Sequence, residues 1–127
     1  MDTIITSEIK KMSPQLVVAD IDDSFEFYTG KPGFEIDMRY EDFYAGISRD
    51  GWSIHLKKGK ALIEERKNKR INEDLDIVFS FDGIENLQQE CLTRAVEFIQ
   101  SLRNMPYGKE FNIADPDGYT IAFLEEA

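Results

Sequence analysis

The segment YGKEFNIADPDGYTIAF, residues 107–123, holds a tight turn between two strand-like runs. Its second half, DGYTIAF (117–123), has a counterpart in DGWSIHL (50–56). Each copy begins with Asp-Gly and continues with an aromatic residue, a small hydroxyl residue, Ile, a variable residue and a large apolar residue. Because Asp-Gly favours a turn between strands, each copy predicts the last strand of a repeated unit.

The residues upstream of each copy follow one common order of elements. Two apolar runs, 14–20 and 75–82, each end in Asp and have the character of buried strands. Each run precedes apolar residues at helical spacing, and strand-like alternation follows. We expect helices over 21–28 and 84–102, a short segment ending at Tyr107, and strands over 34–41, 43–48, 52–57, 109–115 and 119–125.

This order predicts an α+β fold of two βαβββ modules that form a wide, curved, mixed sheet with a cleft. We expect residues 1–127 to form a single domain. Module one is expected at about 10–58, a connector at about 59–74 and module two at about 75–127. The connector carries dense mixed charge, and we expect it to be solvated, with a helical turn around Ala61–Arg66.

Composition narrows the classes of function. The chain has 127 residues and a net charge of −10, which disfavours nucleic-acid binding and suits a cationic ligand. Cys91 is the lone cysteine and lies on the apolar stripe of the second helix pattern, so we expect a buried thiol in a reducing compartment. The sequence shows neither an apolar run of membrane-spanning length nor a signal peptide. We therefore expect a cytoplasmic protein without a membrane partner.

Strand alternation divides the sheet residues between two faces. We expect Trp52, Ile54 and Leu56 to face a helix, and Ser53 and His55 to face the other way. On that second face the strands carry small or polar residues, which favours a sheltered cleft over a plain solvated surface. The candidate ligand-binding residues are Gln15, Ser53, His55, Asp76, Tyr107, Phe111 and Thr120.

Two segments carry a resemblance to a known family. VVADIDDSFEFYTGKPGFEID (17–37) and YGKEFNIADPDGYTIAFLE (107–125) resemble the opening module and the closing motif of the glyoxalase/bleomycin-resistance/dioxygenase (vicinal oxygen chelate) superfamily. The metal-ligand positions of its enzymes correspond to Ser13, His55, Asp76 and Ala122. Since Ala122 has no donor atom and Ser13 is a poor ligand, the resemblance implies no metal cofactor and a likeness to the metal-free bleomycin-resistance-like branch. Since proteins of that branch form homodimers, the resemblance also implies a homodimer and a small-molecule ligand for this chain.

Three functional hypotheses follow. The first is non-catalytic, antibiotic-resistance-like binding of a small organic molecule, with cationic aromatic compounds as a candidate class. The second is a metal-dependent lyase, isomerase or dioxygenase that uses His55, Asp76 and an extra ligand such as Glu110, or a metal-free enzyme that uses His55 as a base. The third is a regulatory module with a vestigial cleft.

Overall fold

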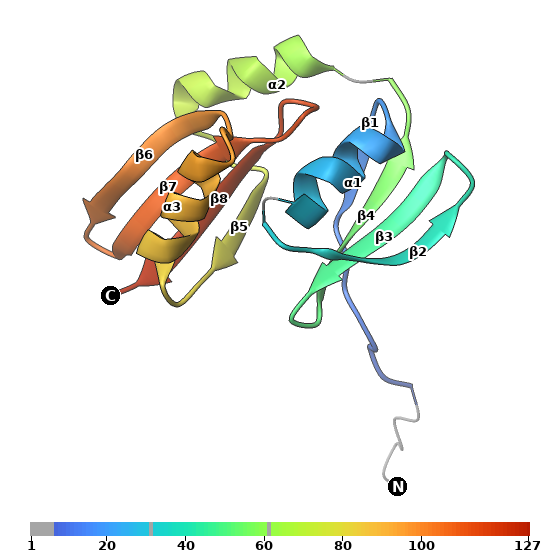
Figure 1. The fold of residues 1–127 in the computed structure, drawn as a ribbon, viewed down its shortest axis with the longest axis horizontal. Coiled ribbons are helices and arrows are strands. Elements are labelled where there is room, and N and C mark those ends of the chain that lie inside the picture. Colours follow the sequence, from blue (N-terminus) through green and yellow to red (C-terminus); the bar gives the residue numbers. More distant parts are fainter. Residues whose placement is uncertain (1–6, 31, 61) are drawn as a thin grey trace, which may run out of the picture.

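The computed structural model describes residues 7–30, 32–60 and 62–127 and contains two βαβββ modules joined by a helical connector (Figure 1). The expectations that fall on residues 1–6, Lys31 and Ala61 lie outside the described residues. Module one comprises β1 (Gln15–Val18), α1 (Ile21–Gly30), β2 (Glu35–Tyr40), β3 (Tyr44–Arg49) and β4 (Trp52–Lys58). The connector comprises α2 (Ile63–Lys69) and the short 3-10 helix η1 (Arg70–Asn72). Module two comprises β5 (Ile77–Ser80), α3 (Ile84–Thr93), β6 (Phe98–Met105), β7 (Gly108–Ala114) and β8 (Thr120–Glu126).

The two modules share one strand topology. The strands form two four-stranded mixed sheets, ordered β1-β4-β3-β2 and β5-β8-β7-β6. In each sheet the first strand is an edge strand and pairs in parallel with the last. The register places Gln15 beside His55 and Val78 beside Ala122, so these two pairs are equivalent. The duplicated α+β architecture expected from the sequence is confirmed.

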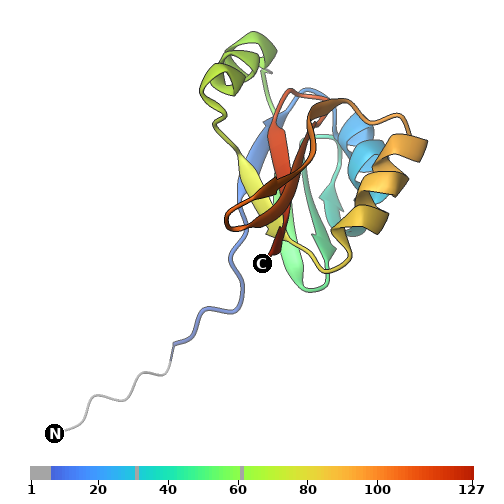
Figure 2. The ribbon, with the colours of Figure 1, turned by 90° about the vertical axis from the view of Figure 1, so that its left-hand side faces the viewer.

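Helices and connector lie on opposite sides of the sheets. Figure 2 shows α1 and α3 on one side and α2 on the other. The side opposite α1 and α3 is called the open face below. No helix within the described residues is both long enough and apolar enough to cross a membrane.

The core extends across both modules beneath α1 and α3. Phe79 stacks on Phe123 with ring centroids 5.9 Å apart, and Phe123 lies 5.1 Å from Phe111. Phe34 of module one contacts Phe79 at 5.6 Å, which joins the two halves of the core. Cys91 is fully buried in the same cluster, as its place on the apolar stripe predicted.

The second helix is shorter than the sequence pattern predicted. α3 ends at Thr93, and residues 98–105, expected to belong largely to the helix, form β6 instead. Ala95 has a positive φ of 55°, which ends the helical path without a glycine or proline. Phe98 then packs on Phe111 at 5.5 Å, and β6 pairs with β7. Pairing with β7 therefore overrides a helical spacing of apolar residues.

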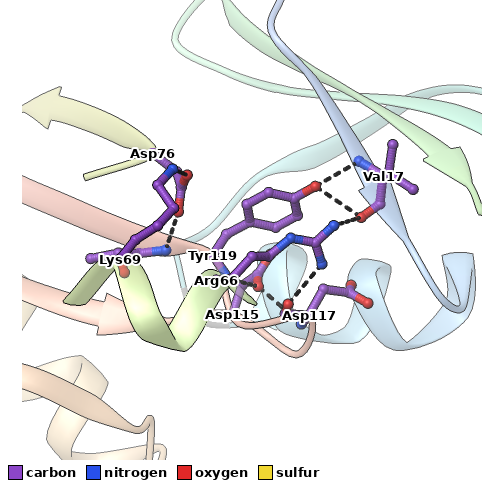
Figure 3. Close-up of polar contacts among 8 residues, drawn as sticks. Val17, Arg66, Lys69, Asp76, Asp115, Asp117 and Tyr119 are labelled. Atoms are coloured by element: carbon purple, nitrogen blue, oxygen red, sulfur yellow. Dashed lines mark hydrogen bonds and ion pairs between the residues drawn. The ribbon is translucent and has the colours of Figure 1, made fainter. Parts of the chain in front are cut away.

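The connector is more ordered than its composition suggested. The helical turn expected around Ala61–Arg66 begins at Ile63 and continues to Lys69 before η1. The side chain of Arg66 extends from α2 and contacts both modules. Its guanidinium donates to the carbonyl of Asp117 at 2.8 Å and to the carbonyl of Val17 at 3.3 Å (Figure 3). It also lies 4.0 Å from the centre of the Tyr119 ring. The connector thus binds the two modules together.

Candidate binding site

A groove lies at the junction of the two modules. Its volume is about 580 Å³, and most of its exposed lining is apolar. Module one contributes residues just before β1 and the start of β4, and module two contributes the edge strand β5. The lining residues are Met12, Pro14, Trp52, Ser53, Ile54, Ile77, Val78, Phe79 and Ser80. We call this site the junction groove.

Trp52 is the largest side chain in the junction groove. It was expected to face a helix with Ile54 and Leu56, but it is 69% exposed while those two residues are buried. The reason is its place at the start of β4, directly after the Asp50-Gly51 turn, whose two residues both have positive φ. The indole therefore extends beyond the helical cover. Val78 on the opposite wall is 51% exposed.

A second hollow adjoins the groove at Trp52. It has a volume of about 320 Å³ and shares Trp52, Phe79 and Ser80 with the junction groove. Two carboxylates, Asp50 and Asp82, line it, and among the described residues Arg49 is the only cation in the lining. The Arg49 guanidinium lies over the Phe81 ring at 4.9 Å and 3.5 Å from the Asp50 carboxylate. Aromatic and acidic side chains are thus combined beside the exposed indole.

A chain of hydrogen bonds fixes His55 on the open face. Gln15 donates from its amide to the Tyr44 hydroxyl at 3.2 Å, and that hydroxyl lies 2.8 Å from Nδ1 of His55. The Tyr44 hydroxyl thus bridges Gln15 and His55, and Nε2 is the ring nitrogen that these two bonds leave free. His55 lies two residues after Ser53 on β4, so the two side chains point to the same face of the strand. The hydrogen-bonded residues Gln15, Tyr44 and His55 therefore lie next to the junction groove.

The four family ligand positions do not form a metal site. The Ser13 hydroxyl is hydrogen-bonded to Ser53, and Nδ1 of His55 is paired with Tyr44. The Asp76 carboxylate accepts from Lys69 Nζ at 2.6 Å and from the backbone N–H of Thr120 at 2.8 Å (Figure 3). Ala122 presents a buried methyl group. No group of three His, Cys, Asp or Glu side chains suited to a metal occurs within residues 7–30, 32–60 and 62–127. These donors do not fit a divalent cation.

The remaining candidates lie apart from the junction groove. Thr120 is buried and bound through its backbone to Asp76. Tyr107 is half exposed beside the β6–β7 turn, where its hydroxyl donates to Glu110 at 2.7 Å. The carboxylate of Glu110, considered above as an extra metal ligand, also forms an ion pair with the Arg103 guanidinium at 3.3 Å. Phe111 is fully buried in the core, so it offers no surface to a ligand and leaves the candidate set.

The end of β1 is held against module two by the Asp115-Pro116-Asp117-Gly118 turn and the following Tyr119. The Asp117 carboxylate accepts from the backbone N–H of Ala19 at 2.8 Å. The Tyr119 hydroxyl accepts from the N–H of Val17 at 2.9 Å and donates to its carbonyl at 3.0 Å (Figure 3). Since β1 is an edge strand, Tyr119 satisfies backbone groups that a neighbouring strand would otherwise bind. These contacts fix module one against module two.

Asp115 carries the strongest electrostatic perturbation in this turn. Its carboxylate accepts from the Tyr28 hydroxyl at 2.7 Å and from the backbone N–H groups of Asp117 and Tyr119 at 2.9 and 2.8 Å. Burial raises the pKa of Asp115 to about 6, although these hydrogen bonds oppose the rise. Burial and the neighbouring Asp115 carboxylate raise the pKa of Tyr28 well above its usual range.

The raised pKa of Asp115 predicts a stability that falls as pH rises. Between the unfolded pKa near 4 and the folded value of about 6, the native state binds more protons than the unfolded state. We expect the stability of the wild type relative to Asp115→Asn to fall by about 3 kcal/mol between about pH 4 and pH 6 and to stay level above that. Urea unfolding of both proteins across this range measures the difference. Parallel pH profiles would contradict the assignment.

Comparison with known proteins agrees with the fold described above. Residues 13–123 match the model of the Glyoxalase/Bleomycin resistance protein/Dioxygenase superfamily. No curated protein matches the sequence significantly.

Three solved structures illustrate the likeness. The bleomycin-binding protein from Streptomyces verticillus, complexed with copper(II)-bleomycin, has a TM-score of 0.69 and 20% identity, over 96% of this chain and 100% of that one. The fosfomycin resistance protein FosX from Listeria monocytogenes has a TM-score of 0.75 and 15% identity, over 97% and 96%. TioX from Micromonospora sp. ML1 has a TM-score of 0.71 and 13% identity, over 93% and 97%. At these identities the likeness establishes the fold alone.

Proposed function

Because this chain belongs to the glyoxalase/bleomycin resistance protein/dioxygenase superfamily, we propose that it binds a small organic molecule in the junction groove without a metal. The observation that carries the proposal is the exposed indole of Trp52 on the wall of an apolar groove about 580 Å³ in volume. Such a groove suits a ligand of drug size, and an exposed aromatic ring gains free energy when a flat molecule stacks on it.

Charge favours a cationic aromatic ligand. The chain has a net charge of −10, and the hollow adjoining Trp52 contains the carboxylates of Asp50 and Asp82. A flat ring system placed on the indole can direct a cationic group toward Asp82. The solved structure with bleomycin supports this class of ligand by fold likeness.

His55 provides a polar group for a ligand beside the junction groove. Its Nδ1 is paired with Tyr44, so Nε2 is the ring nitrogen that can form a hydrogen bond to a ligand. The homodimer and the cytoplasmic location expected from the sequence stay predictions.

The sole tryptophan makes the proposal directly testable. Trp52 is the only tryptophan in the chain, so its intrinsic fluorescence reports on the junction groove. We expect metal-free bleomycin, or a smaller cationic aromatic such as ethidium, to quench this fluorescence saturably. Trp52→Ala is expected to weaken the affinity, measured by calorimetry, by about tenfold, because stacking and apolar burial are both lost.

Tyr107→Ala provides a matched control. Tyr107 is also an exposed aromatic residue but lies beside the β6–β7 turn, so its removal is expected to leave the affinity unchanged. Equal losses in the two variants would contradict binding in the junction groove. A stoichiometric Zn, Fe, Mn or Ni ion in protein purified without chelator, absent from His55→Ala, would overturn the metal-free proposal.

A further inference from the structure

A separate cavity lies on the open face of module two, between the connector and the sheet. Its volume is about 180 Å³, and it shares no residue with the junction groove. Arg70, Glu73 and Asp74 line it from the connector, and Asn112 and Thr120 line it from β7 and β8. We call it the connector pocket. It is a separate site from that of the proposed function.

Unpaired polar atoms gather at the connector pocket. Within the described part of the chain, five buried side-chain nitrogen or oxygen atoms lack a hydrogen-bond partner. Four of them belong to residues that line the pocket, and the fifth, Nε of Arg103, belongs to the side chain that pairs with Glu73 at 3.2 Å. The four are Nε and Nη2 of Arg70, Oδ1 of Asn112 and Oγ1 of Thr120.

These atoms are expensive to leave unpaired. Asn112 is 4% exposed and Thr120 is 2% exposed, so bulk water does not reach their polar groups freely. A buried donor or acceptor without a partner retains its full desolvation cost. Their concentration around one cavity therefore indicates a site that a polar ligand completes.

The geometry of the free atoms defines the chemistry of that ligand. Nε and Nη2 of one guanidinium form a fork that pairs with both oxygens of a carboxylate. Oδ1 of Asn112 needs the opposite partner, a hydrogen-bond donor, and the Thr120 hydroxyl accepts or donates. The ligand must therefore offer a carboxylate and a donor on a compact skeleton.

The charges around the pocket indicate which kind of hydrogen-bond donor the ligand carries. Two carboxylates, those of Glu73 and Asp74, line the pocket together with Arg70, whose Nη1 pairs with Glu97 at 3.7 Å, while Arg103 pairs with Glu73. The Asp74 carboxylate is in place for a cationic group. A simple anion would meet Asp74 unfavourably, whereas an ammonium group is attracted to it. Leu75 and Ile99 complete the lining with apolar surface for a small side chain.

We propose that the connector pocket binds a small α-amino acid, with its carboxylate on Arg70 and its ammonium group directed to Asn112 and Asp74. The cavity volume corresponds to about six water molecules, which limits the ligand to a short side chain. Such a ligand would join η1 to the sheet of module two.

Calorimetric titration of the full chain with L-alanine tests the proposal. We expect saturable binding that Arg70→Met weakens by about tenfold or more, because the charge-assisted fork is lost. Asn112→Leu is expected to abolish binding without lowering the stability of the fold, because it removes an orphaned carbonyl at similar volume. Lys67→Met, on the exposed part of α2, is the matched control and should bind alanine like the wild type.

The alternatives give distinct results. Acetate or inorganic phosphate binding as tightly as alanine would overturn the amino-acid assignment in favour of a general anion site. The absence of binding by glycine, alanine and serine at millimolar concentration would show that the pocket holds water only. Alanine binding lost in Trp52→Ala but kept in Arg70→Met would place the ligand in the junction groove and overturn the proposal. Binding unaffected by Trp52→Ala keeps this site independent of the proposed function.

Discussion

Phe123→Ala is expected to lower the free energy of unfolding by about 4 kcal/mol, the largest effect of any substitution considered. Phe123 is fully buried, and its ring lies 5.9 Å from Phe79, 5.4 Å from Phe81 and 5.1 Å from Phe111. Truncation removes both the apolar burial and the contacts of three neighbouring rings, which cannot all close the cavity. Urea unfolding followed by circular dichroism measures the loss.

The same substitution connects the core to the groove. Phe79 stacks on Phe123 and also lines the junction groove, so a cavity at Phe123 allows one wall of the groove to move. Leu92→Ala is the control, since Leu92 is an exposed apolar residue on α3 and its truncation should change stability by about 0.5 kcal/mol or less. A loss for Phe123→Ala no larger than that for Leu92→Ala would refute the shared aromatic core.

Asp115→Ala is expected to lower the stability by about 3 kcal/mol near neutral pH, because two buried donors and one partly buried donor lose their acceptor at once. The donors are the Tyr28 hydroxyl and the backbone N–H groups of Asp117 and Tyr119. Part of this loss is offset because the substitution also removes a carboxylate that burial disfavours. Chemical unfolding at pH 7 provides the measurement.

Two further variants separate the causes of this loss. Tyr28→Phe removes one of the three donors together with its bond to Asp115, and we expect a loss of about 1 kcal/mol. Asp82→Ala, at an exposed aspartate, should change stability by about 0.5 kcal/mol or less. If Asp115→Ala resembles Asp82→Ala, the turn does not hold the modules together in the way the structure indicates.

Periodicity predicted the fold because both modules repeat one pattern. The echo between residues 50–56 and 117–123 placed two equivalent strands, and alternation placed Ile54 and Leu56 in the core. It failed at the end of α3, where Phe98 and Leu102 satisfy helical and strand spacing equally well. Only the pairing of β6 with β7 decides between the two, and that contact is not local in sequence.

The candidate sites were harder to predict than the fold. Alternation correctly placed Ser53 and His55 on the face opposite the helices, but it could not show that Trp52 lies beyond the helical cover. Arg66 and Arg70 were included in a solvated connector because their targets, Val17, Asp117 and the pocket over β7, are distant in sequence. Asn112 did leave a signal, since it is the polar residue between Phe111 and Ile113 in an otherwise apolar strand.

The duplicated aromatic position shows how the two halves have diverged. Trp52 and Tyr119 occupy equivalent places in their modules, one after each Asp-Gly pair. Tyr119 is committed to architecture through Arg66 and the backbone of Val17, whereas Trp52 remains exposed. Because Tyr119 stabilises the contact between the modules and Trp52 does not, Trp52 can be substituted without loss of the fold. New ligand specificities should therefore evolve by substitution in the first repeat, while the second retains its sequence.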